Sequence, residues 1–315
     1  MEVKVKIRRY NPEKGNEPFF QTYSLDVSPK ETILNVILQI RGEQDRTLGF
    51  RCSCRSAICG SCAMKMNGQG GLACNTQVEN VISKDGEILI EPAGNMDVIR
   101  DLIVDFNFFW DKIKQVTPYL QYSGPAPERE HLCSNEEMID LSLVTECVMC
   151  GSCVSDCTVL EVDKNFLGPA ALAKVYRFVS DPRDKANDSR LSQASQYTGM
   201  WDCTHCFKCV EACPKRVLPM ERILSLRKIA MDSGHTGNVG TRHSKAITDS
   251  VEHSGTLNEV TVMPKSFGWW NIKENLALIP SGIRMMRRGK MPKLLHPKLP
   301  NMENIKRIFR KFKKK

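Results

Sequence analysis

The alternation of hydrophobic and polar positions at the start of the chain predicts β-strands. Residues 3–7 place an apolar side chain at every second position, and residues 20–27 repeat this pattern after a turn-forming segment at 11–15, as strands with one buried face do. Residues 28–31 (SPKE) have the spacing of a helix cap, and an apolar stripe at helical spacing follows over 33–38. The order strand, strand, helix is therefore expected.

In the middle of the chain, hydrophobic residues recur at the spacing of helices rather than of strands. After a short strand expected at Glu87–Glu91, residues 96–118 have a helical and aromatic pattern. Beyond a Gly/Pro-rich break at 124–127, residues 128–231 are almost wholly helical in pattern. Residues 233–268 are polar and weakly periodic, which predicts a loop or an extended arm.

The cysteine residues give the strongest indication of chemistry in the sequence. The chain of 315 residues is 41% hydrophobic, enough to form real cores, and 12 of its 14 cysteines fall into three tight clusters. The C-x2-C spacings within these clusters are typical of metal ligation rather than of a disulfide scaffold. The thiols are therefore expected to be reduced and bound to metal.

The first cluster has the spacing C-x4-C-x2-C, with a fourth Cys after eleven further residues. This is the plant-type 2Fe-2S pattern, in which a tight loop wraps the cluster and glycines such as Gly60 let the backbone approach it. A structural zinc site is the alternative, although zinc sites usually combine two C-x2-C knuckles. The predicted 2Fe-2S ligands are Cys54, Cys59, Cys62 and Cys74.

Two further runs, each C-x2-C-x2-C-x3-C, predict two cubane clusters. The second run is followed by Pro214, as in bacterial two-cluster ferredoxins, where the fourth Cys of each run ligates the other cluster. One 4Fe-4S cluster is therefore expected on Cys147, Cys150, Cys153 and Cys213. The second cubane is expected on Cys157, Cys203, Cys206 and Cys209. Cys52 and Cys133 fit no run and are expected to be ordinary thiols.

These elements predict an α+β protein with three regions. Residues 1–105 would form a plant-type ferredoxin (β-grasp) domain, because two strands, a helix, a Cys loop and a strand occur in that order. Residues 106–232 would form an all-α, bacterial-ferredoxin-like domain that carries both cubanes. Residues 233–315 would form an extension that ends in a basic amphipathic tail.

Five stretches within residues 1–232 resemble the iron-sulfur subunits of the succinate dehydrogenase/fumarate reductase family. They are SCRSAICGSCAMKMNG…LAC, VIRDLIVDF, ECVMCGSC, GPAALAKVYRFVSDPRD and VEACPKRVLP, in the family's order. The resemblance implies an electron-transfer subunit of the tricarboxylic acid cycle or of anaerobic respiration. The N-terminal domain would face an FAD-containing flavoprotein that converts succinate or fumarate, and the helical domain would pass electrons toward quinone. No residue of this chain is expected to bind the dicarboxylate.

The chain departs from the family pattern in three places. Most members lack a cysteine at the position of Cys206 and hold a 3Fe-4S cluster, so Cys206 implies a second 4Fe-4S cluster, with 3Fe-4S as the alternative if this thiol is not a ligand. Residues 158–160 (TVL) replace the family's Pro and tryptophans, and His205 is shifted by one position, so quinone contact is expected to be indirect. The segment LALIPSGIRMMRRGKMPKLL is similar to heterodisulfide-reductase C-type subunits, which implies a heterodisulfide-reductase-B-like partner in place of a haem-bearing anchor.

The positive charge is concentrated in the tail. The net charge is +9, but residues 281–315 hold thirteen Lys/Arg and one acid, Glu303, which leaves −3 for residues 1–280. Residues 301–315 place apolar side chains on one helical face and cations around it, a pattern typical of a helix in a membrane interface and equally of a helix docked on a partner subunit. Nothing resembles a nucleic-acid recognition module.

No run approaches the 18 or more apolar residues of a spanning helix, and the N-terminus has no signal-peptide core. A peripheral membrane location on the cytoplasmic side is expected, or export together with a partner subunit. Two other functions fit part of the pattern. An iron-sulfur subunit of another flavin-dependent dehydrogenase would share the cubane runs but not the loop around Cys54–Cys74. A zinc-stabilised structural or nucleic-acid-binding protein would use the same thiols without redox chemistry.

Overall fold

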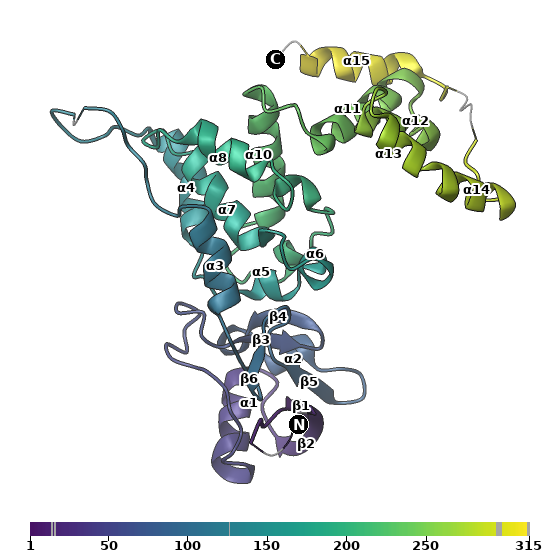
Figure 1. The fold of residues 1–315 in the computed structure, drawn as a ribbon. Coiled ribbons are helices and arrows are strands. Elements are labelled where there is room, and N and C mark those ends of the chain that lie inside the picture. The colour runs from purple at the N-terminus through teal and green to yellow at the C-terminus, as the bar shows by residue number, and fades with distance from the viewer. Residues whose placement is uncertain (14, 16, 126, 294–297, 314–315) are drawn as a thin grey trace. The chain divides into compact units, whose positions relative to one another are not determined.

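The computed structural model describes residues 1–13, 15, 17–125, 127–293 and 298–313. The chain divides into two compact units, Met1–Ile229 and Ala230–Lys315. The first unit contains a β-sheet, a helical part and every cysteine of the chain. The described part of the second unit contains helices and no strand (Figure 1).

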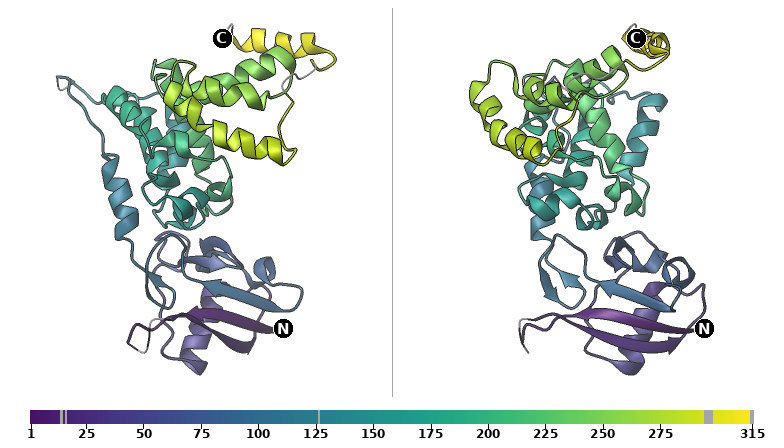
Figure 2. Two further views of the ribbon diagram at one scale, coloured as in Figure 1. Left: turned by 45° about the vertical axis from the view of Figure 1, so that its right-hand side comes forward. Right: turned by 90° about the vertical axis from the view of Figure 1, so that its right-hand side faces the viewer.

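A sheet forms the first part of unit 1, at the purple and blue end of the ribbon in Figure 2. It has five strands in the order β2-β1-β5-β3-β4. The strands are β1 (Glu2–Arg9), β2 (Phe19–Asp26), β3 (Ala63–Met66), β4 (Gln69–Leu72) and β5 (Glu87–Glu91). Strand β1 pairs antiparallel with β2 and parallel with β5. The predicted period-2 pattern is confirmed, since Val3, Val5 and Ile7 of β1 are fully buried.

Helix α1 (Ile33–Gln39) buries Ile33, Leu34 and Ile37 in the same core as the inward-facing side chains of the sheet. Its cap differs from the prediction. Thr32, not Ser28, is the N-cap, and its hydroxyl accepts a 3.2 Å hydrogen bond from the Asn35 N–H, because the chain first makes a turn at residues 28–31. The remaining elements here are η1 (Ile40–Gln44), η2 (Ala73–Asn75) and α2 (Val78–Val81).

The predicted helix over residues 96–118 is wrong in its first half. The chain there forms the strand pair β6 (Val98–Arg100) and β7 (Ile103–Val104), and only then helix α3 (Asn107–Gln115). The hairpin turns at Asp101, which has a positive φ of 47°. Its buried carboxylate accepts hydrogen bonds from Arg9 Nε (2.9 Å) and from the Gly49 N–H (2.8 Å). These long-range bonds favour the turn over the helix that the apolar period suggested.

The helical part of unit 1 is arranged around α7 (Gly168–Val179), which packs against α3, α4, α5 and α8. Ten of its twelve residues are buried. The other elements are α4 (Asn135–Thr145), α5 (Ser152–Ser155), α6 (Thr158–Val162), α8 (Asn187–Ala194), η3 (Met200–Asp202), α9 (Lys208–Glu211) and α10 (Pro219–Asp232). The mainly helical character predicted for residues 128–231 is confirmed, although α10 extends a few residues into the second unit.

The second unit corrects the expectation of a loop over residues 233–268. That stretch contains α11 (Val239–Ser254) and α12 (Glu259–Phe267), which pack on each other. Small polar side chains such as Ser250, Ser254 and Ser266 are buried here, so the buried faces carry little hydrophobic signal in the sequence.

Three shorter or more exposed helices follow in the second unit. They are α13 (Ile272–Ala277), α14 (Ile279–Arg287) and α15 (Met302–Lys313). The predicted amphipathic tail is thus helical from residue 302, while residues 314 and 315 lie outside the described part of the chain. Among the described helices, none has the length and apolar character needed to cross a bilayer.

Candidate functional site

The first cysteine loop connects the end of α1/η1 to strand β3, and left-handed backbone conformations bend it tightly. Arg55 (φ 56°), Ala57 (φ 54°) and Gly60 (φ 74°) all have positive φ. A loop with this many positive-φ residues turns successive backbone N–H groups toward one side. The fourth cysteine, Cys74, lies in η2 and reaches the same side from the far end of the β3–β4 hairpin.

Backbone N–H groups of this loop donate to the cysteine sulfurs. Cys54 Sγ accepts three such bonds and Cys74 Sγ accepts one. The donors are the N–H groups of Ser56 (3.4 Å), Ile58 (3.3 Å) and Cys59 (3.3 Å) to Cys54, and of Ala57 (3.3 Å) to Cys74. Since N–H groups stabilise a negatively charged sulfur, this arrangement fits thiolates that hold a 2Fe-2S cluster.

The other two thiols of the first set have opposite electrostatic surroundings. A hydrogen bond with Ser61, at 3.2 Å between Cys59 Sγ and Ser61 Oγ, lowers the pKa of Cys59 to about 6. Burial raises the pKa of Cys62 to about 12. A thiolate at the buried position needs nearby positive charge, which bound iron supplies.

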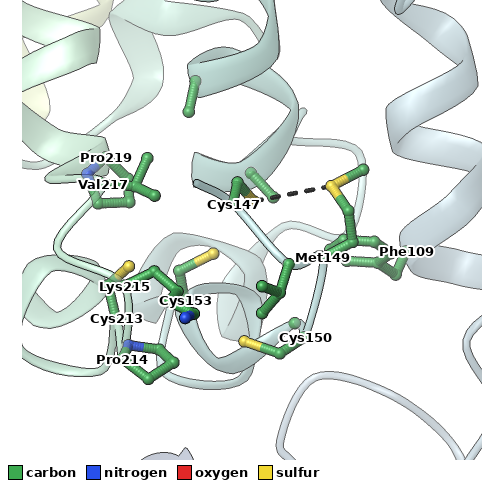
Figure 3. A pocket seen from close by; sticks show the side chains of 14 residues that line it. Phe109, Cys147, Met149, Cys150, Cys153, Cys213, Pro214, Lys215, Val217 and Pro219 are labelled. Carbon is green, nitrogen blue, oxygen red and sulfur yellow. Dashed lines mark hydrogen bonds between the residues drawn. The ribbon is translucent and has the colours of Figure 1, made fainter. Parts of the chain in front are cut away.

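Four thiols from two distant runs meet in one largely apolar cavity. Cys147, Cys150, Cys153 and Cys213 line it, and Figure 3 shows their sulfurs around the same space. Burial raises the pKa of Cys153 far above its ordinary value, and the neighbouring thiols of this set raise it further. Apolar side chains, among them Phe109 and Val217, form much of the remaining wall. This is the set predicted for the first 4Fe-4S cluster, and a water-poor, thiol-lined cavity fits that group.

The remaining four predicted thiols also lie together. Burial raises the pKa of Cys209 to about 12, with further contributions from its neighbours Cys203, Cys157 and Cys206. Cys206 is the exposed member of this set, and its sulfur accepts a hydrogen bond from the Thr158 hydroxyl at 3.5 Å. Cys157, from the first run, is therefore grouped with cysteines of the second run.

No three His, Cys, Asp or Glu side chains of the described residues lie close enough together to bind a single metal ion. This includes the three thiol sets, whose predicted occupants are clusters of several irons and not single ions. Two cysteines lie outside the runs. Cys52 packs against the core of the sheet domain, and Cys133 Sγ is 3.9 Å from Glu137 Oε2 at the start of α4.

Arg227 of α10 is a buried cation beside the second cubane set, and sequence reasoning did not single it out. Its guanidinium donates to the carbonyl oxygens of Met200 (2.6 Å from Nη2) and Cys203 (2.9 Å), faces the ring of His205 and lies over the Trp201 ring at 5.1 Å. A single Arg in an ordinary helical pattern carries no signal for such a role, because only the packing of α10 against the cysteine loop brings the two together.

The loops of the 2Fe-2S set and the first cubane set are in direct contact. A Cβ atom placed on Gly60 would lie 2.8 Å from Cys150 Cβ and 3.1 Å from the Val148 carbonyl oxygen. Only glycine allows this approach, since such separations are shorter than van der Waals contact. The two cluster-binding loops therefore pack against each other at this glycine.

Two polar residues that the sequence did not mark join the halves of unit 1. The carboxylate of Asp156 accepts a 2.7 Å hydrogen bond from the N–H of Gly70, which belongs to β4. The Asn95 amide donates to the carbonyl oxygens of Val154 (2.8 Å) and Cys157 (3.0 Å). These bonds connect the sheet domain to the first cubane run, within the compact unit that contains all three thiol sets.

The fold and the thiol sets define the class of protein: an iron-sulfur protein for electron transfer. A family model described as "2Fe-2S iron-sulfur cluster binding domain" matches residues 4–111, and one described as "4Fe-4S dicluster domain" matches residues 143–217. The chain is also similar to one subunit of the Mycobacterium smegmatis Sdh1 complex in the apo form, with a TM-score of 0.66 and 23% identity over 75% of this chain and 98% of that one.

Curated relatives narrow the class to one family. The chain is 34% identical to the 8-methylmenaquinol:fumarate reductase iron-sulfur subunit of Wolinella succinogenes, over 92% of this chain and 91% of the relative. It is 35% identical to the succinate dehydrogenase iron-sulfur subunits of Coxiella burnetii (73% of this chain, 98% of the relative) and Paracoccus denitrificans (72% and 87%). The chain therefore belongs to the family of succinate dehydrogenase/fumarate reductase iron-sulfur subunits.

Membership confirms several predictions at once. The chain is an electron-transfer subunit of an oxidoreductase complex and carries 2Fe-2S and 4Fe-4S binding domains. The predicted α+β class, with a sheet domain before a helical ferredoxin-like domain, is confirmed as well. The match to the Wolinella subunit spans 92% of the chain, more than residues 1–232 contain, so it includes much of the C-terminal extension.

Proposed function

We propose that twelve cysteines hold three iron-sulfur clusters in series. The 2Fe-2S cluster would be held by Cys54, Cys59, Cys62 and Cys74, and the first 4Fe-4S cluster by Cys147, Cys150, Cys153 and Cys213. The second 4Fe-4S cluster would be held by Cys157, Cys203, Cys206 and Cys209. The observation that carries this proposal is the grouping of thiols from runs some sixty residues apart, with the 2Fe-2S loop in contact with Cys150.

When bound, such clusters accept and donate single electrons. The protein's own residues hold them close together and shield them. The N–H groups of the first loop stabilise sulfur charge, and apolar side chains keep water away from the middle set. Arg227 adds positive charge beside the last set, which favours its reduced form.

The two outer sets reach the surface, and this supports partners at both ends. Ile58 and Cys59 are exposed at the 2Fe-2S loop, and we assign an FAD-containing flavoprotein subunit, which converts succinate or fumarate, to that side. Cys206 and Phe207 are exposed at the second cubane loop, and we assign the electron acceptor or donor linked to quinone to that side.

The C-terminal extension bears on which subunit is the quinone-side partner. We propose a heterodisulfide-reductase-B-like subunit, with quinone reached through it. Residues 158–160 lack the tryptophans that the ordinary family places near quinone, and the segment from Leu276 onward is similar to heterodisulfide-reductase C-type subunits. The relative named as an 8-methylmenaquinol:fumarate reductase subunit matches over most of the extension and supports a link to quinol, although its name says nothing of the partner subunit. Identification of the subunits that co-purify with the chain tests this assignment.

Electron paramagnetic resonance of the anaerobically purified complex tests the ligand sets. The oxidised parent should lack a 3Fe-4S signal, and Cys206→Ser should produce one, because a cubane that loses one ligand readily loses one iron. Cys133→Ser is the matched control and should leave every signal unchanged. A strong 3Fe-4S signal in the parent would exclude Cys206 as a ligand.

A second test concerns the fourth cysteine of each run, which is assigned to the cubane of the other run (the crossed assignment). Cys157→Ser changes the first run but should perturb the second cubane, whereas Cys213→Ser changes the second run but should perturb the first. If each substitution instead affected the cubane of its own run, the crossed assignment would be wrong. Absence of iron from the anaerobic preparation would exclude all three sets.

A further inference from the structure

The second unit presents a continuous apolar stripe that nothing in the described part of the chain covers. Helices α13 and α14 follow each other directly, and neither contains a buried residue. The stripe residues recur at alternating spacings of three and four, and each is between 40% and 69% exposed: Trp269, Ile272, Leu276, Ile279, Ile283 and Met286. The five of these residues that lie in α13 and α14 share one helical face, because Leu278 between the two helices also has helical backbone angles. Trp269 lies in the turn just before α13.

Cations flank this stripe, and acids are nearly absent. Arg284 follows stripe residue Ile283, and Arg287 and Arg288 follow Met286. Between Glu274 and Glu303 the sequence contains no acidic residue. Trp270, beside the first stripe residue, is 95% exposed. An apolar face bordered by arginines, with tryptophan at its edge, has the composition of a helix that lies in a membrane interface.

Helix α15 repeats this composition within the same unit. It packs against α11, where Lys306 and Arg310 share a hollow with acidic residues of α11 such as Asp249. Its side chains Ile308 and Phe312, four residues apart, are more than half exposed. The positive charge on the α11 side is thus partly compensated by acidic residues, while Arg307 is exposed.

We propose that α13–α14 and α15 bind the surface of an anionic lipid membrane, with the stripe side chains entering the headgroup region. A protein partner with an apolar groove would also cover the stripe, but it would not explain thirteen Lys/Arg against one acid over residues 281–315. Anionic headgroups complement that charge. This surface supplements any contact with partner subunits and does not depend on the assignment of the cluster ligands.

Co-sedimentation of the full-length, cluster-loaded chain with lipid vesicles tests the proposal. The chain should bind vesicles of phosphatidylcholine mixed with phosphatidylglycerol, bind pure phosphatidylcholine much more weakly, and lose affinity as salt rises. The stripe variant combines Ile279→Asp, Ile283→Asp and Met286→Asp. We expect it to bind the anionic vesicles at least about ten-fold more weakly, because three apolar side chains no longer enter the interface.

A control variant separates this effect from a change in net charge. It combines Leu132→Asp, Ile139→Asp and Leu143→Asp, three exposed apolar positions of the first unit, and adds the same charge as the stripe variant. An unchanged visible spectrum of the clusters shows that the first unit is folded in both variants, because every cysteine lies in that unit. An unchanged far-ultraviolet circular dichroism spectrum shows that the helices of the second unit are retained as well. The proposal is overturned if the parent does not bind anionic vesicles, or if the stripe and control variants bind them equally. It is also overturned if the stripe variant keeps vesicle binding and instead fails to co-purify with a partner subunit.

Discussion

Gly60 offers the sharpest test of how the first two cluster loops are arranged. It lies between the predicted ligands Cys59 and Cys62, has φ of 74°, and leaves no room for a Cβ atom, which would lie 2.8 Å from Cys150 Cβ. Gly60→Ala therefore combines a backbone penalty with a steric clash. Gly68 is the matched control, because it has φ of 79° and nothing within 4 Å of an added Cβ.

The two penalties can be separated by magnitude. An L-residue in the left-handed region costs about 1–2 kcal/mol, and both substitutions incur this cost. Overpacking adds about 1–3 kcal/mol, and only Gly60→Ala incurs it, because Cys150 is held by its own loop and cannot move away freely. For a unit of this size, about 1 kcal/mol lowers the melting temperature by about 2–4 °C.

Thermal melts of the cluster-loaded protein, followed by visible absorbance, compare the two variants. Gly60→Ala should melt several degrees below Gly68→Ala. If the loops separate instead of unfolding, the magnetic interaction between the reduced 2Fe-2S cluster and the neighbouring cubane should weaken. Equal melting temperatures together with an unchanged interaction would refute the close contact of the two loops.

Substitutions at three further sites test charges and contacts of the first unit. Arg227→Gln should lower the reduction potential of the second cubane by roughly 40–90 mV, which corresponds to about 1–2 kcal/mol for one charge lost at an effective dielectric near 20. Arg227→Lys keeps the charge and should have most of the parent's reduction potential. A redox titration followed by electron paramagnetic resonance measures both. Burial opposes the charge of Asp181, but hydrogen bonds from Arg183 and Arg177 outweigh it and lower its pKa to about 2. A depressed carboxyl pKa stabilises the fold at every pH above the ordinary pKa of the group. Asp181→Asn should therefore lower the melting temperature equally at pH about 6 and about 8, by the equivalent of about 2–3 kcal/mol. A loss that disappeared at one of the two pH values would contradict this. Asp156→Ala removes the acceptor of the buried Gly70 N–H group in β4, which costs about 1–3 kcal/mol. Amide hydrogen exchange in that strand should therefore become faster. Unchanged exchange would show that this contact does not hold the sheet domain and the helical part of unit 1 together.

Local sequence patterns predicted the structure correctly wherever residues close together in the chain determine the local conformation. The period-2 runs predicted β1, β2 and β5, since alternation is what a half-buried strand requires. The cysteine spacings predicted cluster binding, because one short loop must bring several thiolates to one inorganic group. The family domains found over residues 4–111 and 143–217 agree with both predictions.

Local patterns failed where a distant residue decides the conformation. The apolar period of residues 98–104 suggested a helix, yet the bond between Asp101 and Arg9, 92 positions apart in the sequence, favours a hairpin. The polar stretch around Ser250 looked like a loop, because helices α11 and α12 bury small polar side chains rather than a hydrophobic stripe.

The sequence by itself therefore determined the chemistry of this protein: sulfur ligands, their grouping into runs, and the family to which those runs belong. Only the tertiary structure decided what surrounds that chemistry. The contact of Gly60 with Cys150, the Arg227 cation beside the second cubane set and the Asp156 link to Gly70 each join residues far apart in the chain. The reason is physical, since ligand spacing is a property of a few consecutive residues, whereas the distance and the electrostatic surroundings of each site arise only when separate segments pack together.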